Sequence, residues 1–311
     1  MKIVVVGPGA IGCLVAALLA KTKEEVWLLD KESERAKFLD QHGIKIEGLA
    51  NFEVKIPTTS DPQKIKTADI VIICVKSYDT KKAILHAKAL IGDKTIILTL
   101  QNGLGNIELI NEVLDDERTI GAVTNMGATK LVEGHIRYAG KGETIIGSLD
   151  GSIGVSLRDI RELFIRAGIQ TRISRDIKSA LWSKLIINVG INPLTALTRL
   201  PNGKLLVFEG TRLLMSQAVT EAVKVCRRKK IKLLFEDPLS KVEAVCEATA
   251  TNISSMLQDV LRKKRTEIDA INGVIVRLGQ ELNVPVPVNS MLVSLVKTLE
   301  ESYSYTVAEV K

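Results

Sequence analysis

The chain has 311 residues, of which 46% are hydrophobic, 25% charged and 4% aromatic. Its length favours two domains, and its composition excludes a disordered, fibrous or disulfide-rich chain. The 43 basic against 36 acidic residues give a formal net charge of +7, which favours anionic partners without selecting among them.

Strand and helix patterns alternate in the first half of the chain. Runs of apolar, β-branched residues predict strands that are buried on both faces. These strands are expected at residues 3–6, 26–29, 69–75 and 95–100. Helices are expected after them, at residues 11–21, 33–42, 79–91 and 104–114. The alternation predicts an α/β fold that begins with a doubly wound parallel sheet of Rossmann type, and glycine-punctuated runs over 119–147 predict hairpins that close this sheet.

The pattern changes near residue 175, after which strand-like runs end. Helical stretches are expected at residues 177–198, 208–230, 238–263, 264–282 and 289–302. Proline and glycine separate several of them. We therefore expect a dinucleotide-binding Rossmann-like domain over residues 1–175 and an all-helical substrate and catalytic domain over residues 176–311. Apolar stretches in this helical domain are compatible with a homodimer.

Histidine and cysteine usage narrows the chemistry and the location. The three histidines end at His135, so the second half of the chain must work without imidazole and offers no histidine metal site. The four cysteines form no CxxC pair, which is typical of buried thiols in a reducing compartment. The apolar run 10–20 is too short to cross a bilayer. We therefore expect a cytoplasmic protein with no bound metal and no membrane partner.

Residues 7–12 read Gly-Pro-Gly-Ala-Ile-Gly and fit the pattern G-x-G-x-x-G, directly after a predicted strand and at the start of a predicted helix. Such glycines permit a tight turn, close approach of a pyrophosphate and packing of the helix on the sheet. The helix N-terminus offers N–H groups to the anion. A glycine-rich turn without a ligand is the alternative, which this context disfavours. We expect the dinucleotide to contact Gly7, Gly9, Ala10, Ile11 and Gly12.

The end of the second predicted strand bears on the choice of cofactor. Asp30 follows Gly12 by 18 residues, where a carboxylate accepts a ribose 2′-hydroxyl and disfavours a 2′-phosphate. This position favours NAD(H). Lys31 follows immediately and could instead bind a phosphate, and an aspartate at a strand end is also a common solvated turn residue.

A polar line crosses the apolar stretch 181–197. Lys184, Asn188 and Asn192 are spaced four residues apart, so they share one helix face. Apolar surroundings would lower the pKa of the lysine and make it a competent general acid toward a carbonyl oxygen. A lysine and two asparagines on a wet helix surface are the alternative. Pro193 favours the functional interpretation, because it is expected to break the helix where a cleft opens.

A second polar set lies further along the chain. The hydroxyl of Ser255 suits a carboxylate, and Glu267 could bind hydroxyl groups of a substrate or of a ribose. A capping serine and a solvated glutamate explain the pair equally well. The basic runs 227–230 and 262–265 lie on predicted helices without interleaved aromatic residues, so they predict solvated faces and no nucleic-acid partner.

Eight segments together resemble one family, that of the ketopantoate reductases (2-dehydropantoate 2-reductases). The segments are GPGAIG at 7–12, VKSYD at 75–79, QNGLGN at 101–106, WSKLIINVGINPLTAL at 182–197, PNG at 201–203, NISSMLQD at 252–259, TEIDAING at 266–273 and PVPVN at 285–289. They are spread over essentially the whole chain, and the helical ones are far more specific than the glycine signature.

The resemblance implies roles for the polar residues of the helical half. Lys184 would give a proton to the ketone of the substrate. Asn188 and Asn192 would bind the substrate, with help from Asn202 in the PNG turn. Ser255 would take the carboxylate of the substrate. These roles agree with what the residue types and their spacing already indicate.

The resemblance also implies a cofactor, NADP(H), and residues that contact it. Asn102 would touch both the nicotinamide and the substrate, and Glu267 would lie at hydroxyl groups of cofactor and substrate. Lys76 would approach the phosphate or ribose of the cofactor, and Gly127 would contribute backbone near the nicotinamide. The chain departs from the family at Asp30, where many members carry a basic residue, so NAD(H) is also expected.

The expected function is therefore the reduction of ketopantoate to pantoate by NAD(P)H on the route to pantothenate and coenzyme A, with a small 2-oxo acid as the partner molecule. An alternative keeps the fold and changes the substrate to another small 2-oxo or 3-hydroxy acid. A catalytically silent dinucleotide sensor is a third hypothesis, and it would need the N-terminal turn without the polar residues of the helical half.

Overall fold

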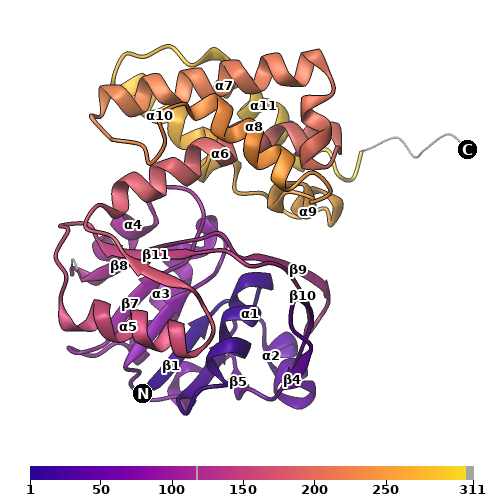
Figure 1. The fold of residues 1–311 in the computed structure, drawn as a ribbon. Coiled ribbons are helices and arrows are strands. Elements are labelled where there is room, and N and C mark those ends of the chain that lie inside the picture. The colour runs from indigo at the N-terminus through magenta and orange to yellow at the C-terminus, as the bar shows by residue number, and fades with distance from the viewer. Residues whose placement is uncertain (117, 306–311) are drawn as a thin grey trace, which may run out of the picture. The chain divides into compact units, whose positions relative to one another are not determined.

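The structure is a computed structural model that describes residues 1–116 and 118–305 (Figure 1). The chain divides into two compact units. The first unit contains residues 1–101 and 105–177, and the second contains residues 102–104 and the chain from residue 178 onward. The short segment 102–104 thus belongs with the helical unit, although it lies in the first half of the sequence.

The first unit is built on an eight-stranded sheet with the order β12-β11-β8-β7-β6-β1-β2-β5. These strands are β1 Lys2–Val6, β2 Glu25–Leu29, β5 Thr58–Thr59, β6 Ile70–Ile73, β7 Ile96–Thr99, β8 Thr119–Thr124, β11 Thr144–Ser148 and β12 Thr171–Ile173. Neighbouring strands are parallel except β8 and β11, which pair antiparallel. The predicted parallel, doubly wound core is confirmed.

Helices pack on this sheet as the alternating pattern predicts (Figure 1). They are α1 Ala10–Leu19, α2 Ser33–His42, α3 Thr80–Ala87, α4 Asn106–Leu114 and α5 Val155–Arg166. Ile3 and Val5 of β1 belong to the apolar cluster that contains α1, whereas Val4 and Val6 belong to a second cluster that contains Ile84 of α3. Both faces of the central strand are therefore buried, which is why its sequence is continuously apolar.

A separate four-stranded sheet, with the order β4-β3-β10-β9, corrects one prediction. Its strands are β3 Ile44–Gly48, β4 Phe52–Val54, β9 Gly127–Val132 and β10 His135–Gly140. The expected hairpins over 119–147 were thus only partly right, because β8 and β11 extend the main sheet while β9 and β10 pair in this one. We did not predict β3 and β4. They are short and half-buried, so they lack a continuous apolar run.

The second unit contains helices joined by loops and no strand within its described residues. Its elements are α6 Ile177–Thr198, α7 Glu209–Arg228, α8 Pro238–Ala248, α9 Ser255–Leu261, α10 Asn272–Glu281 and α11 Pro287–Glu301, with 3₁₀ turns η4 Asn202–Leu206 and η5 Ile268–Ala270. One cluster of buried apolar residues joins all six α-helices. Within residues 1–116 and 118–305, we find no helix with the length and hydropathy that crossing a bilayer requires.

Three expectations about these helices were wrong. The stretch 238–263 forms two helices, because Ser254 caps a new helix by accepting a hydrogen bond from the N–H of Leu257 at 3.1 Å. The stretch 264–282 becomes α-helical only at Asn272. Pro193 does not break α6, which continues to Thr198. The Thr195 hydroxyl donates to main-chain carbonyls of the preceding turn, which adds to the hydrogen bonds of the helix after Pro193.

Candidate active site

The turn over residues 7–12 lies between β1 and α1 in the first unit. Gly7 has φ +96° and donates its N–H to the carbonyl of Leu29 at 2.9 Å. A Cβ on Gly12 would lie 2.1 Å from the carbonyl oxygen of Gly7, so only glycine allows this closure. At Gly9 no heavy atom lies within 4 Å of an added Cβ. The turn is thus closed by its outer glycines and open at its middle one, directly before the N-terminus of α1.

Five charged side chains form ion pairs at the carboxyl end of β2. Asp30 is 2% exposed, and its carboxylate accepts hydrogen bonds from Arg35, one of them at 2.6 Å from Nη2, and from the N–H of Glu32 at 3.1 Å. Arg35 also pairs with Glu32 at 3.3 Å. Lys31 pairs with Asp79 at 2.8 Å. Three carboxylates therefore face two basic groups in these pairs.

Buried polar side chains join the loops that follow β6 and β7. Gln101 donates to the carbonyl of Val75 at 2.9 Å and to the hydroxyl of Thr80 at 2.8 Å. The Thr80 hydroxyl in turn donates to the side-chain oxygen of Asn106 at 3.0 Å. We did not predict roles for these residues, although Gln101 and Asn106 flank Asn102 in the QNGLGN segment. Their contacts fix the carboxyl edge of the sheet.

Two other predicted cofactor residues also belong to the first unit. Lys76 precedes the 3₁₀ turn η2 Ser77–Asp79, which follows β6, and its side chain is partly exposed. Gly127 is the first residue of β9, where an added Cβ would lie 3.1 Å from the backbone nitrogen of Gly140. The structure therefore places Lys76 at the carboxyl edge of the main sheet and Gly127 at the start of the second sheet.

The predicted polar face lies on α6 in the second unit. Lys184 and Asn188 are half-buried, and Asn192 is 5% exposed. Burial lowers the pKa of Lys184 to about 8, while the carboxylate of Glu267 acts in the opposite direction. A lysine with this pKa is largely protonated at neutral pH and gives up its proton more readily than a solvated lysine does.

Glu267 lies near Lys184 and directly precedes the 3₁₀ turn η5. Glu267 is 5% exposed. The segment 102–104 packs on this turn, because the N–H of Leu104 donates to the carbonyl of Ala270 at 3.1 Å. The second unit therefore brings together Lys184, Glu267 and the segment that carries Asn102, three of the predicted positions that are far apart in the sequence.

The contacts around Ser255 and Asn202 show which of the neighbouring polar side chains have structural roles. Ser254, rather than Ser255, caps α9, and its hydroxyl also lies 2.6 Å from that of Thr195 on α6. Ser255 is the first residue of that helix and is partly exposed. Asn202 is 8% exposed and donates to the hydroxyl of Thr249 at 2.9 Å, so it ties the PNG turn to the end of α8. Its contact with a substrate stays a prediction.

The two basic runs differ in their setting, which corrects a further expectation. Arg227 and Arg228 lie in the last turn of α7, as predicted, whereas Lys229 and Lys230 follow the end of this helix. The run 262–265 does not lie on a helix, because α9 ends at Leu261. Cations near a helix C-terminus interact favourably with its dipole, which accounts for the first run without a nucleic acid.

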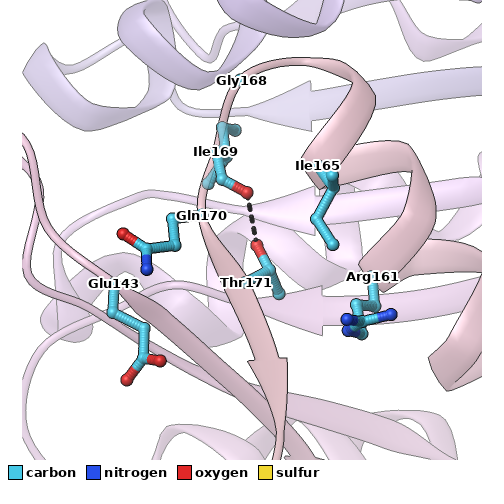
Figure 2. A pocket seen from close by; sticks show the side chains of 7 residues that line it. All are labelled: Glu143, Arg161, Ile165, Gly168, Ile169, Gln170 and Thr171. Carbon is cyan, nitrogen blue, oxygen red and sulfur yellow. Dashed lines mark hydrogen bonds between the residues drawn. The ribbon is translucent and has the colours of Figure 1, made fainter.

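A shallow hollow of about 470 Å³ lies in the first unit (Figure 2). Its lining residues are Glu143, Arg161, Ile165, Gly168, Ile169, Gln170 and Thr171. None of these is a predicted site residue, so we do not place the active site there. Within residues 1–116 and 118–305, histidine, cysteine and carboxylate side chains form no group that could hold a metal ion.

Comparison with known protein families agrees with the motifs. The model of the ketopantoate reductase PanE/ApbA family matches residues 3–151, and the model of its C-terminal part matches residues 176–300. This chain is a member of the ketopantoate reductase family. The resemblance that the eight sequence segments indicate is therefore confirmed.

Ketopantoate reductases from distant organisms are similar over nearly the full length. A 2-dehydropantoate 2-reductase of Pyrococcus horikoshii is 36% identical and aligns over 96% of this chain and 98% of its own. One of Vibrio cholerae is 33% identical over 98% of this chain and 99% of its own. Among solved structures, a ketopantoate reductase of Ralstonia eutropha has 33% identity and a TM-score of 0.90, with 98% of this chain and 100% of that chain covered.

A relative of different name shares the ketopantoate reductase fold. D-mandelate dehydrogenase, solved with NADH and anilino(oxo)acetate, is 25% identical with a TM-score of 0.90, and the match covers 97% of this chain and 99% of that one. The predicted α/β fold with a helical C-terminal part is confirmed by these neighbours. Proteins with this fold can therefore differ in name and substrate, so the fold alone does not identify the substrate.

Proposed function

We propose that this chain reduces 2-dehydropantoate to pantoate with NAD(P)H, a step toward pantothenate and coenzyme A. Family membership supports the reaction, and the polar face of α6 supports the chemistry. The observation that carries the proposal is the half-buried Lys184, whose pKa is lowered to about 8 beside Glu267. A silent dinucleotide sensor would have no use for such a group.

The turn over residues 7–12 has the geometry that a pyrophosphate requires. Gly7 and Gly12 close the turn, and the open side of Gly9 lets an anion approach the backbone. The N–H groups at the start of α1, from Ala10 and Ile11 onward, would hold the anion through the helix dipole. The reduced nicotinamide supplies the hydride when bound. We assign this turn to the dinucleotide, together with Lys76 and Gly127.

Residues of the second unit would bind the substrate and deliver the proton. Lys184 would donate a proton from Nζ to the ketone oxygen as negative charge develops there. Asn188 and Asn192 would hold polar groups of the substrate on the same face of α6, and the hydroxyl of Ser255 would donate a hydrogen bond to its carboxylate. Glu267 would keep Lys184 protonated and bind a hydroxyl group, while Asn102 would lie beside the nicotinamide.

Steady-state kinetics with a panel of 2-oxo acids tests this function. The panel holds ketopantoate, other branched 2-oxo acids and an aromatic 2-oxo acid, each assayed with NADH and with NADPH. We expect ketopantoate to have the highest kcat/KM. A higher value for the aromatic acid would instead favour a substrate related to that of D-mandelate dehydrogenase, and no turnover with any acid would favour a sensor.

The proton donor predicts a pH dependence. Because the pKa of Lys184 is about 8, the fraction of protonated lysine falls as pH rises through this value. We expect kcat/KM for ketopantoate to fall above about pH 8. Glu267 raises this pKa, so Glu267→Gln should move the alkaline limb of the profile to lower pH. A profile that stays flat to pH 10 would contradict the role of Lys184.

We propose that the cofactor is NADH rather than NADPH. A 2′-phosphate would add negative charge where three carboxylates already face two basic groups, and both basic groups are paired. The negative charge of the Asp30 carboxylate, which is held by Arg35 and by the N–H of Glu32, would repel a 2′-phosphate at this position. Arg35 was not singled out from the sequence, and its pairing with Asp30 keeps it from acting as a free phosphate ligand.

Asp30→Asn should shift this cofactor preference toward NADPH. The change removes the negative charge that repels a 2′-phosphate and releases Arg35 from its ion pair, so that Arg35 can donate to the phosphate. A hydrogen bond to a charged group contributes about 1.5–3 kcal/mol, so the ratio of kcat/KM with NADH to that with NADPH should fall roughly tenfold or more. Glu34→Gln is the control, since it removes the same charge from an exposed position on α2. An equal shift in both variants would contradict a specific role for Asp30.

Two further expectations remain proposals. A homodimer is tested by sedimentation equilibrium of the full chain over a range of concentrations. Cytoplasmic location is tested by fractionation of cells that express the chain at its natural level. Neither affects the assignment of the substrate.

A further inference from the structure

Pro193 lies within α6 and leaves one carbonyl of the helix without its usual donor. A proline has no N–H, so the carbonyl of Val189, four residues earlier, loses its intrahelical hydrogen bond. Val189 is buried, and a buried polar group without a partner is destabilising. Another group must therefore supply the donor for α6 to continue.

The side chain of Asn272 supplies this donor. Asn272 is the first residue of α10 and is 0% exposed. Its Nδ2 donates to the carbonyl of Val189 at 3.3 Å and to Oδ1 of Asn289 at 2.9 Å. A side chain from a separate helix thus takes the place of the N–H that Pro193 lacks.

Asn289 and Glu221 fix the orientation of this amide. Asn289 on α11 is 0% exposed, and its Nδ2 donates to the carbonyl of Ala218 at 3.0 Å and to Glu221 at 2.7 Å. The Glu221 carboxylate on α7 also accepts the N–H groups of Val288 and Asn289, each at 2.9 Å. Those N–H groups lie in the first turn of α11, where no intrahelical acceptor exists. The network therefore joins α6, α7, α10 and α11.

Close packing holds α6 at the same point. A Cβ on Gly190, the residue after Val189, would lie 2.9 Å from Val219 on α7 and 3.0 Å from Val242 on α8. The segment 189–193 is thus held by the Asn272 hydrogen bond and by contact with two other helices. It connects Asn188 to Asn192, which are both on the proposed substrate-binding face.

We propose that Asn272 is a positioning residue for the reduction: by replacing the missing N–H of Pro193, it sets where Asn192 lies relative to Asn188 and Lys184. Asn272 is fully buried, so it acts through α6 and not on the substrate. The inference rests on the proposed function of these three residues. Beyond that function, Pro193 and its compensating donor set the positions of the substrate-binding side chains on α6.

Asn272→Leu tests this role with a side chain of similar size that cannot donate. We expect kcat/KM for ketopantoate to fall roughly ten- to hundredfold, since small misplacements of binding groups have effects of this size, and mainly through a higher KM. The dissociation constant of the reduced dinucleotide, measured by fluorescence titration, should not change. Val296→Ala is the control, because it removes buried apolar contacts from α11 two turns beyond Asn289. It should lower the unfolding temperature and keep the wild-type KM.

Pro193→Ala separates positioning from stability. The alanine restores an N–H for the carbonyl of Val189, so the double variant Asn272→Leu/Pro193→Ala should unfold at a higher temperature than Asn272→Leu. Its KM should stay raised, because the helix then takes regular geometry between Asn188 and Asn192. A KM that returns to the wild-type value together with stability would overturn the proposal.

The remaining outcomes also decide the matter. A wild-type KM in folded Asn272→Leu would show that Asn272 supports only the fold, and it would overturn the proposal. If that variant does not fold, Pro193→Ala alone should raise KM, and an unchanged KM would overturn the proposal. If the wild-type chain prefers another acid of the panel, the proposed function fails, and the same variants are then measured with the preferred acid.

Discussion

Lys184→Ala should lower kcat with ketopantoate by roughly 10²–10⁴-fold, the range expected for loss of a positioned general acid. The second unit offers few other acids to replace it, because the chain has no histidine after His135. The turn over residues 7–12 is unchanged in this variant, so binding of the reduced dinucleotide should be unchanged. Stopped-flow measurement of nicotinamide oxidation reports the chemical step directly.

Lys178→Ala is the matched control for this experiment. Lys178 lies on the same helix, α6, but its side chain is exposed. It carries the same charge, so its removal changes the net charge equally without touching the proposed proton donor. We expect nearly wild-type kcat. If Lys184→Ala also kept nearly full turnover, or if both variants lost the same activity, Lys184 would not be the acid.

The pattern of the sequence predicts most of the fold because its signals are local. Continuous apolar strands such as 70–73 and a 22-residue apolar helix with its polar line are visible without any tertiary information. The short strands β3 and β4 are half-buried, and β3 pairs with β10, whose residues lie about 90 positions away, while β4 pairs only with β3. Spacing within the sequence carries no such information.

The candidate site is predictable where one helix or one turn carries it. Lys184, Asn188 and Asn192 share a face by helical spacing alone. The contact of segment 102–104 with the turn after Glu267 is not predictable in this way. It joins two loops that lie far apart in the sequence, and the first of them follows a strand of the first unit. The pairing of Asp30 with Arg35 is also not predictable from the sequence, because an aspartate at a strand end can be either a ribose ligand or a turn residue.

Pro193 shows how a correct local rule can give a wrong result. A proline normally ends or bends a helix because it removes one donor. Here the side chain of Asn272 donates to the carbonyl of Val189, which Pro193 leaves without its usual donor, so α6 continues. The compensating donor comes from a residue 79 positions further along the chain, at a distance that only the tertiary fold closes.

Gly103→Ala should be the most damaging glycine substitution for catalysis in the second unit. Gly103 has φ +81°, and an added Cβ would lie 2.5 Å from the carbonyl oxygen of Ala270 and 2.7 Å from its Cβ. Segment 102–104 and the turn that follows Glu267 must therefore move apart. Asn102 and Glu267 lie on either side of this contact, and a displacement of about 1 Å can cost roughly 10²-fold in rate. We expect a loss of this size in kcat/KM for ketopantoate.

Gly105→Ala separates this close approach from backbone strain. Gly105 also has a positive φ, of +91°, but no heavy atom lies within 4 Å of an added Cβ. Both variants carry the conformational cost of a left-handed alanine, about 1–2 kcal/mol, so both should unfold at lower temperature than the wild-type chain. Only Gly103→Ala should also lose activity at a temperature where both remain folded. Equal activity in the two folded variants would show that the contact with Ala270 supports the fold alone and does not place Asn102 for the reaction.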